Sequence, residues 1–113
     1  MPRDYRFYLE DIQSAIEKID IFTLGLSFDQ FRQDALRTDA VLYNLQIIGE
    51  AAKHLLDELK GRYPNTEWRK ITALRDILAH EYFGISMEIV WDIVQNKIPA
   101  LRSEIKRLIE EAK

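Results

Sequence analysis

Three side chains near the middle of this chain, Arg75, His80 and Tyr82, could together carry out chemistry on a phosphate group. Arginine is a permanent cation, and its planar guanidinium matches the oxygens of a phosphate. Histidine takes up and releases protons near neutral pH, and the hydroxyl of tyrosine can donate a hydrogen bond or be modified. We therefore consider Arg75 and His80 as candidate catalytic residues of a phosphate-directed site.

The spacing of Arg75 and His80 limits how they can meet. On an ideal helix, five residues correspond to a rotation of about 140°, so the two side chains would not point the same way. Three arrangements remain open. Arg75 can bend back, the helix can end near Ala79 and free His80, or two subunits can bring their motifs face to face across a two-fold axis.

Each motif residue also has a structural interpretation. A histidine near a helix end, such as His80, interacts well with the helix dipole. Arg75 could form a salt bridge with Asp76, and Tyr82 could pack at the end of the helix. The joint occurrence of the three residues favours function over these separate explanations.

A second group of polar residues lies about 30 residues earlier. Gly49 interrupts a good helical pattern at a cost of about 1 kcal/mol relative to alanine, and such a glycine indicates close approach of another element. Asn44 and Glu50 could orient Arg75 or His80, as could Asp76 beside the motif, or they could be ordinary polar groups at a helix contact. His54 follows Glu50 by four residues and is expected to be its ion-pair partner rather than a catalytic group.

Hydrophobic periodicity predicts helices nearly throughout and no strands. We expect a first helix over about 4–22. A short helix should follow Ser27, with Ser27 as its N-cap and Gln30 as the capping-box partner three residues later. A long helix should begin near Thr38 or Asp39 and run to about Arg62. The motif helix should begin near Asn65 or Thr66 and end at Gly84. Ser86 should cap a last helix, which Pro99 would kink or cause to restart near Asn96.

These elements predict an all-α, up-and-down bundle of four to five helices in one domain, residues 1–113. The wide apolar face of the long helix favours a homodimer. The chain has no cysteine and a net charge of −3, but residues 53–75 carry six basic and three acidic side chains. Neither a membrane-spanning run nor a signal-peptide core is evident, so we expect a cytoplasmic protein. No H-E-x-x-H motif or carboxylate cluster accompanies His54 and His80, so we expect no metal site, and we expect no other cofactor.

The order Arg75, four residues, His80, one residue, Tyr82 resembles the R-x4-H-x-Y motif of the HEPN superfamily, and within it the HepT-like proteins. The resemblance covers nearly the whole chain. The stretches that carry it include Asp39-Ala40-Val41, Ile48-Gly49-Glu50-Ala51-Ala52, Tyr63-Pro64, Trp68-Arg69-Lys70-Ile71 and Tyr82-Phe83-Gly84.

The resemblance implies a metal-independent endoribonuclease toxin with a composite site at a dimer interface. Its partners would be RNA and a minimal nucleotidyltransferase antitoxin, which would AMPylate Tyr82. Two His80 side chains could serve as base and acid, and two Arg75 side chains could stabilise the phosphorus transition state. One alternative is a non-catalytic subunit that binds nucleotide or RNA beside a nucleotidyltransferase. Another is a structural helical dimer whose motif only caps a helix.

Overall fold

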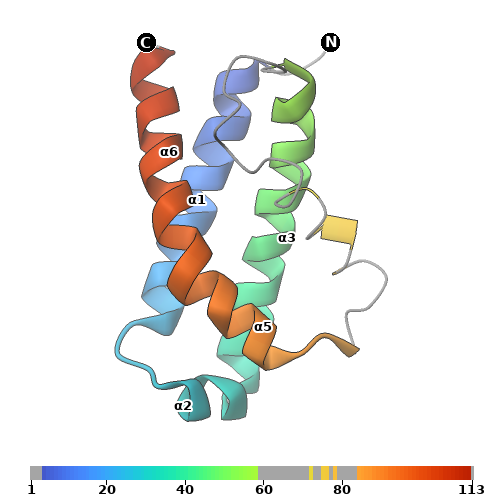
Figure 1. Ribbon diagram of the computed structural model, residues 1–113, viewed down its shortest axis with the longest axis vertical. Coiled ribbons are helices and arrows are strands. Elements are labelled where there is room, and N and C mark those ends of the chain that lie inside the picture. Colours follow the sequence, from blue (N-terminus) through green and yellow to red (C-terminus); the bar gives the residue numbers. More distant parts are fainter. Residues whose placement is uncertain (1–3, 59–71, 73–74, 77, 79–83, 113) are drawn as a thin grey trace.

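The computed structural model describes residues 4–58, 72, 75–76, 78 and 84–112 (Figure 1). All the regular elements of this part are helical, which confirms the all-α fold class. In chain order they are α1 (Tyr5–Thr23), α2 (Phe28–Gln33), α3 (Ala35–Glu58), α5 (Met87–Asp92), a π-helical turn η2 (Ile93–Lys97) and α6 (Ile98–Glu111). Residues 72, 75, 76 and 78 are also helical.

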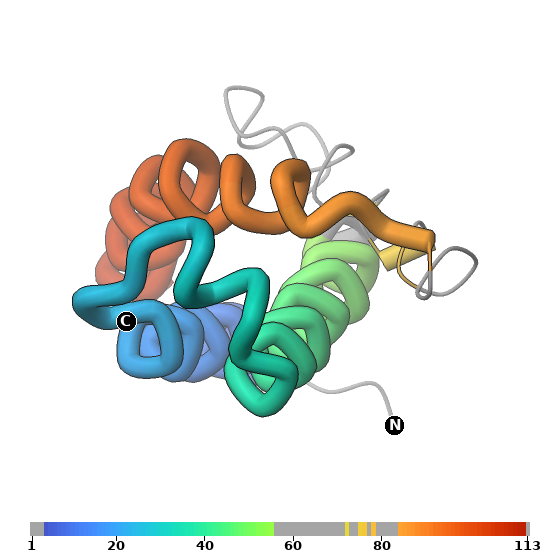
Figure 2. Tube along the Cα trace, turned by 90° about the horizontal axis from the view of Figure 1, so that it is seen from below, coloured from blue at the N-terminus to red at the C-terminus, as the bar shows by residue number. Residues whose placement is uncertain are grey.

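Helix α1 is the centre of the bundle and contacts both α3 and α6. It runs antiparallel to each of them, as the colour gradient shows (Figure 1). Viewed along the bundle, α1 lies between α3 on one side and α6 on the other, with α2 crossing one end (Figure 2). This arrangement follows from the sequence, because apolar residues recur on α1 at intervals of three and four.

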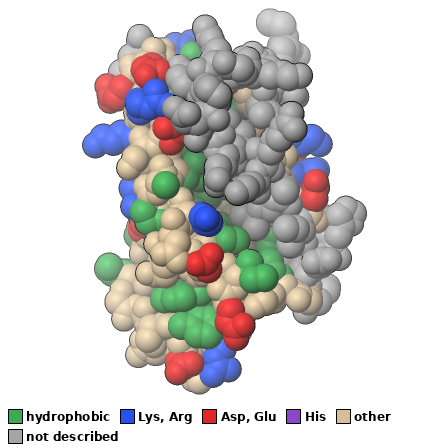
Figure 3. All heavy atoms as spheres, in the orientation of Figure 1, with side chains coloured by type: hydrophobic (Ala, Val, Ile, Leu, Met, Phe, Trp, Pro, Cys, Tyr) green, Lys and Arg blue, Asp and Glu red, His purple; other side chains and the backbone are tan. Residues whose placement is uncertain are grey.

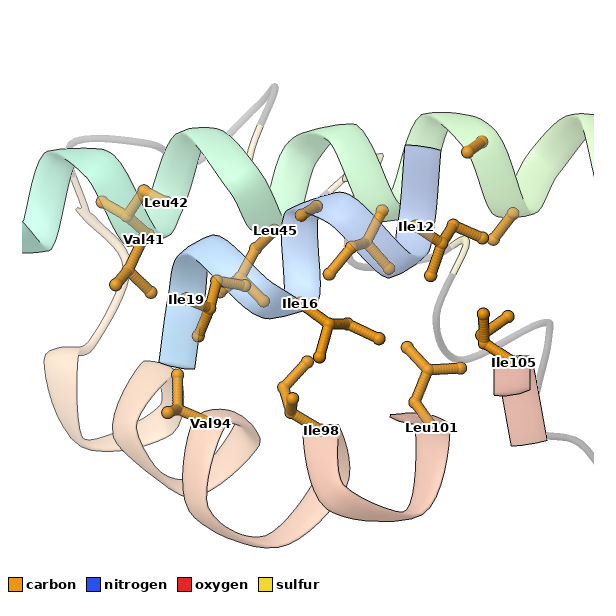
Figure 4. Packing of buried hydrophobic residues seen from close by; sticks show 14 of the residues in the cluster. Ile12, Ile16, Ile19, Val41, Leu42, Leu45, Val94, Ile98, Leu101 and Ile105 are labelled. Carbon is orange, nitrogen blue, oxygen red and sulfur yellow. The ribbon is translucent and has the colours of Figure 1, made fainter. Parts of the chain in front are cut away.

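The core is built mostly from aliphatic side chains of these three helices, with Phe31 of α2, Val90 of α5 and Val94 of η2 added to it (Figure 4). Side chains of α1 fill the space between α3 and α6, with Ile16 facing Ile98 and Leu101. The fully or almost fully buried residues include Leu9, Ile12, Ile16, Ile19, Val41, Leu45, Ile48, Leu55, Ile98 and Ile105. The apolar spacing of the motif segment predicts that Leu78 points inward, and Leu78 is buried. The same spacing predicts inward-pointing side chains at four residues that lie outside the described part of the chain: Trp68, Ile71, Leu74 and Ile77.

Side-chain caps set the starts of α1, α2 and α3. The predicted capping box of α2 is confirmed: Ser27 Oγ accepts from the backbone N–H of Gln30, and Gln30 Oε1 accepts from that of Ser27. The predicted start of α3 near Thr38 or Asp39 is wrong, because the helix begins at Ala35. Asp34 accepts a hydrogen bond from the Arg37 backbone N–H at 3.1 Å and so performs the capping role.

Pro99 disturbs the last helical segment, as predicted, but through a different local structure. The backbone N–H of Ile98 donates to the carbonyl of Ile93, five residues back, which closes a π-helical turn. Helix α6 then begins at Ile98 rather than near Asn96, and Pro99 occupies its first turn. The π-helical turn accommodates the proline, which has no N–H to donate to the preceding turn.

Two contacts between distant parts of the chain complete the bundle. The Trp91 ring of α5 lies 5.1 Å from that of Phe31 in α2, measured between centroids. Arg102 of α6 forms an ion pair with Asp20 of α1, with 2.5 Å between Nη2 and Oδ1. Among the described helices, none combines the length and apolar character needed to cross a membrane.

Candidate functional site

The motif segment meets α3 at Gly49, as the sequence predicted for this glycine. A Cβ atom added to Gly49 would lie 2.7 Å from the Cβ of Arg75 and 3.0 Å from its backbone nitrogen. No side chain fits in that space, so only glycine lets the two backbones approach this closely. Gly49 therefore sets the position of the Arg75 backbone on the surface of α3.

Arg75 lies against two carboxylates. Its Nε donates a hydrogen bond to Oε2 of Glu50, the residue next to Gly49. Its Nη1 donates to Oδ1 of Asp76 at 3.2 Å, which is the ion pair that the sequence suggested for those neighbours. The hydrogen bond that Arg75 donates to Glu50, followed by the attraction of the Glu50 charge, raises the pKa of Arg75 above its already high ordinary value. Arg75 is thus a fixed cation at every physiological pH.

Glu50 has a second neighbour on its own helix. His54 Nε2 lies 3.8 Å from Glu50 Oε1, which agrees with the predicted pairing one helical turn apart. The imidazole ring of His54 is stacked on the ring of Tyr8 from α1, with centroids 4.6 Å apart and planes 8° from parallel. Contacts therefore run from Tyr8 through His54 and Glu50 to Arg75.

Asn44 is buried on the same helix, and its side chain is hydrogen-bonded to the backbone of the preceding helical turn. Its side chain is 3% exposed, and Nδ2 donates to the carbonyl of Ala40 at 2.8 Å. Within the described part of the chain, Asn44 Oδ1 and the buried Oγ1 of Thr72 have no hydrogen-bond partner. The structure thus joins Glu50 and Asp76 to Arg75, whereas Asn44 donates its hydrogen bond to Ala40 of its own helix.

The remaining motif residues, His80 and Tyr82, lie outside the described residues, so their roles stay predictions. Tyr8 and Thr72 are not among the residues that the sequence predicts for the site. Thr72 precedes Arg75 by three residues and so shares its helix face, a spacing that could have identified it. Among the described residues, no group of three histidine or carboxylate side chains could hold a metal ion.

Surface charge is mixed on the face seen in Figure 3, where basic and acidic side chains are interspersed among apolar ones. The full chain carries 16 basic and 19 acidic residues. This composition does not favour a broad cationic surface that could bind a polyanion. Any attraction for a polyanion has to be concentrated at particular arginine and lysine side chains.

Comparisons with known proteins agree on one family. The family described as ribonuclease HepT-like matches residues 12–108. A Methanocaldococcus jannaschii protein provisionally named as an RNase is 42% identical over 112 residues, covering 98% of this chain and 93% of the relative. A Thermococcus cleftensis protein provisionally named ribonuclease HepT is 39% identical over 108 residues, covering 96% and 98%.

A Caldanaerobacter subterraneus protein, also provisionally named as an RNase, is 36% identical over 108 residues and covers 96% of both chains. No solved structure matches the chain. The family match includes α3, Gly49, Glu50 and the whole of the motif from Arg75 to Tyr82. Because this match and its relatives span nearly the full sequence, the protein belongs to the HepT-like ribonuclease family.

Proposed function

We propose that the protein is an endoribonuclease toxin that cleaves RNA without a metal ion, at a site formed by two copies of the chain. Membership of the HepT-like ribonuclease family is the observation that carries this proposal. The position of Arg75 supports it, because a partly exposed guanidinium fixed against α3 can bind a phosphate.

The chemistry uses the nucleophile that RNA itself supplies. One His80 removes the proton of the 2′-hydroxyl, whose oxygen attacks the adjacent phosphorus. The bond from phosphorus to the 5′-oxygen breaks, and the protonated His80 of the partner subunit gives its proton to that oxygen. The products are a 2′,3′-cyclic phosphate and a free 5′-hydroxyl. Arg75 stabilises the charge that builds up on the phosphate oxygens.

A dimer would place two copies of the motif together and double the local positive charge. The surface of α3 supports this assembly, because Leu36 and Tyr43 are 83% and 63% exposed despite being apolar. Residues seven apart on a helix lie within about 20° of the same face. Leu36, Tyr43 and Glu50 therefore form one row that leads to Arg75.

A toxin requires control, and we assign Tyr82 as the residue through which an antitoxin acts. A minimal nucleotidyltransferase would join the Tyr82 hydroxyl to the α-phosphorus of ATP and release pyrophosphate. The attached AMP would bring a phosphate close to the motif, where it competes with the RNA backbone for the same cations. Single-stranded RNA is the expected substrate, because a splayed linkage can enter a narrow site.

A cleavage assay on purified protein tests the proposal. Wild-type protein should cut single-stranded RNA in the presence of EDTA and leave cyclic phosphate ends. His80→Ala should lower the rate by roughly 10²–10⁴-fold with unchanged helical content. Activity that disappears with EDTA and returns with a divalent cation would contradict metal independence. RNA binding without cleavage would favour the non-catalytic accessory subunit instead.

A further inference from the structure

Glu50 has both carboxylate oxygens engaged, and the two sets of contacts differ in kind. Oε2 accepts the hydrogen bond from Arg75 Nε. Oε1 faces His54 Nε2 at 3.8 Å, too far for a hydrogen bond but close enough for an ion pair when His54 is protonated. Glu50 therefore links the motif arginine to an aromatic stack between α1 and α3.

We propose that Glu50 is the positioning residue of Arg75, and that the stacked pair Tyr8–His54 restrains Glu50 in that role. The effect of this role on catalysis rests on the ribonuclease function proposed above. Neither Glu50 nor Tyr8–His54 touches the RNA in this scheme. They determine which edge of the Arg75 guanidinium is presented to the scissile phosphate.

The geometry of the guanidinium supports this assignment. An arginine has five N–H donors in one plane, and fixing two of its nitrogens fixes that plane. Glu50 occupies Nε and Asp76 occupies Nη1, whereas no described residue contacts Nη2. The two N–H donors of Nη2 are therefore left for a phosphate.

Stability alone does not explain the contact. Ion pairs between partly exposed side chains contribute little to folding, because solvent screens the charges. Here Arg75 is 32% exposed and Glu50 50% exposed. The pair nevertheless comes with Gly49, whose missing side chain permits the close backbone approach. Such a combination is better explained by a requirement for the position of Arg75 than by a gain in stability.

A competing explanation predicts the opposite sign of effect. If Glu50 merely neutralised Arg75, its removal would free a cation, strengthen RNA binding and raise cleavage. If Glu50 positions Arg75, removal of the Glu50 carboxylate lets the guanidinium adopt other orientations. A misplacement of about 1 Å can lower the rate of cleavage by up to about 100-fold. Two variants, Glu50→Ala and Glu50→Gln, separate these cases.

The test is to measure kcat and KM on single-stranded RNA for both variants, with Glu17→Ala as control. Glu17 is an exposed glutamate of α1, remote in sequence from the motif. We expect kcat to fall by up to about 100-fold in Glu50→Ala. The fall should be smaller in Glu50→Gln, whose amide oxygen still accepts from Nε. Unchanged or raised kcat in Glu50→Ala, with Glu17→Ala as active as wild type, would overturn the proposal.

His54→Phe tests the restraint on Glu50, since it keeps a ring to stack on Tyr8 and removes the nitrogens. It should lower kcat less than Glu50→Ala does. It should cause no further loss when combined with Glu50→Gln. A full additional loss in the combined variant would show that His54 acts apart from Glu50, and would overturn this part of the proposal.

A readout independent of cleavage separates this inference from the proposed function. In the NMR spectrum of protein labelled with ¹⁵N-arginine, the Arg75 Nε–H signal should be protected from exchange in wild type and lose protection in Glu50→Ala. Protein that cleaves no RNA but shows this change would refute the ribonuclease and retain the positioning contact. Identical Arg75 signals in the two proteins would refute the contact itself.

Discussion

Gly49 and Arg75 are so close that a single added carbon atom would separate their segments. The Cβ of an alanine at position 49 would lie 2.7 Å from Arg75 Cβ and 3.1 Å from its Cα. These are backbone and near-backbone atoms, which cannot swing aside as the end of a long side chain would. The contact therefore ties the position of the motif arginine to a helix more than 20 residues earlier.

Gly49→Ala should destabilise the protein although alanine is the better helix former. The helix would gain about 1 kcal/mol from propensity, but overpacking in a close contact typically costs 1–3 kcal/mol. RNA cleavage should fall more than stability, because Arg75 is displaced. Urea unfolding and the cleavage assay measure the two effects. Gly84→Ala is the matched control, since a Cβ there meets nothing within 4 Å. A stabilised, fully active Gly49→Ala protein would contradict the contact.

Arg75→Lys should retain charge and lose most activity. A lysine cannot donate to Glu50, Asp76 and a phosphate in one plane, as the guanidinium does. Removing a donor of this kind typically costs roughly 10²–10³-fold in rate. Arg32→Lys provides the control, because Arg32 is also a partly exposed arginine in an ion pair, with Asp29. Near wild-type cleavage by Arg75→Lys would show that a point charge is sufficient.

Tyr82 should gain mass when the protein is incubated with ATP, magnesium and its cognate nucleotidyltransferase. Intact-mass spectrometry should show one or more AMP units and a parallel loss of ribonuclease activity. Tyr82→Phe should remain active and unmodified. Tyr63→Phe is a suitable control because it removes another tyrosine hydroxyl. Modification that persists in Tyr82→Phe would move the acceptor to another residue.

The protein should be a dimer at micromolar concentration, and Tyr43→Glu should weaken it. Tyr43 is an exposed aromatic residue on the row of α3 that leads to Glu50, and a charge there opposes burial. Light scattering at several concentrations measures the equilibrium. Leu24→Glu is the control, because Leu24 is 82% exposed but lies in the turn after α1. A monomeric wild-type protein would count against a site shared by two subunits.

Acid should remove the cap of α1 over a defined pH range. Asp4 accepts hydrogen bonds from the side chain and backbone N–H of Arg6, which lower its pKa from 3.8 to about 2. Because the folded pKa lies below the unfolded one, this contribution is complete above about pH 4 and disappears as the pH falls toward 2. Asp4→Asn should show a weaker pH dependence of unfolding there. Equal dependence in both proteins would exclude the cap as its source.

Local signals made parts of the fold predictable. Ser27 and Gln30 lie three residues apart, so their capping box is visible in the sequence alone. The start of α3 was misplaced because Asp34, Thr38 and Asp39 can all cap a helix, and only the folded chain selects Asp34. Thr38 instead donates its hydroxyl to the Ala35 carbonyl at 3.0 Å within the first turn.

Only the contacts of the candidate site between residues close in the sequence were predictable. Glu50 and His54 are one turn apart, and Gly49 is conspicuous inside its helix. The stacking of Tyr8 on His54 joins residues 46 positions apart, and periodicity assigns Tyr8 to a buried stripe without naming its partner. Likewise, the sequence left open whether Glu50 would meet Arg75, because the contact depends on how the two segments cross.

The ion pair between Asp20 and Arg102 joins residues 82 positions apart. The apolar side of α1 also depends on contacts with a distant part of the chain, since Ile16 faces Ile98 and Leu101 of α6 (Figure 4). During synthesis, α1 leaves the ribosome before α6, so its apolar face stays exposed until α6 has been made. Contacts of such long range slow folding and leave apolar surface exposed meanwhile. A chain interrupted before α6 would therefore be a substrate for cellular proteases rather than a partly active enzyme.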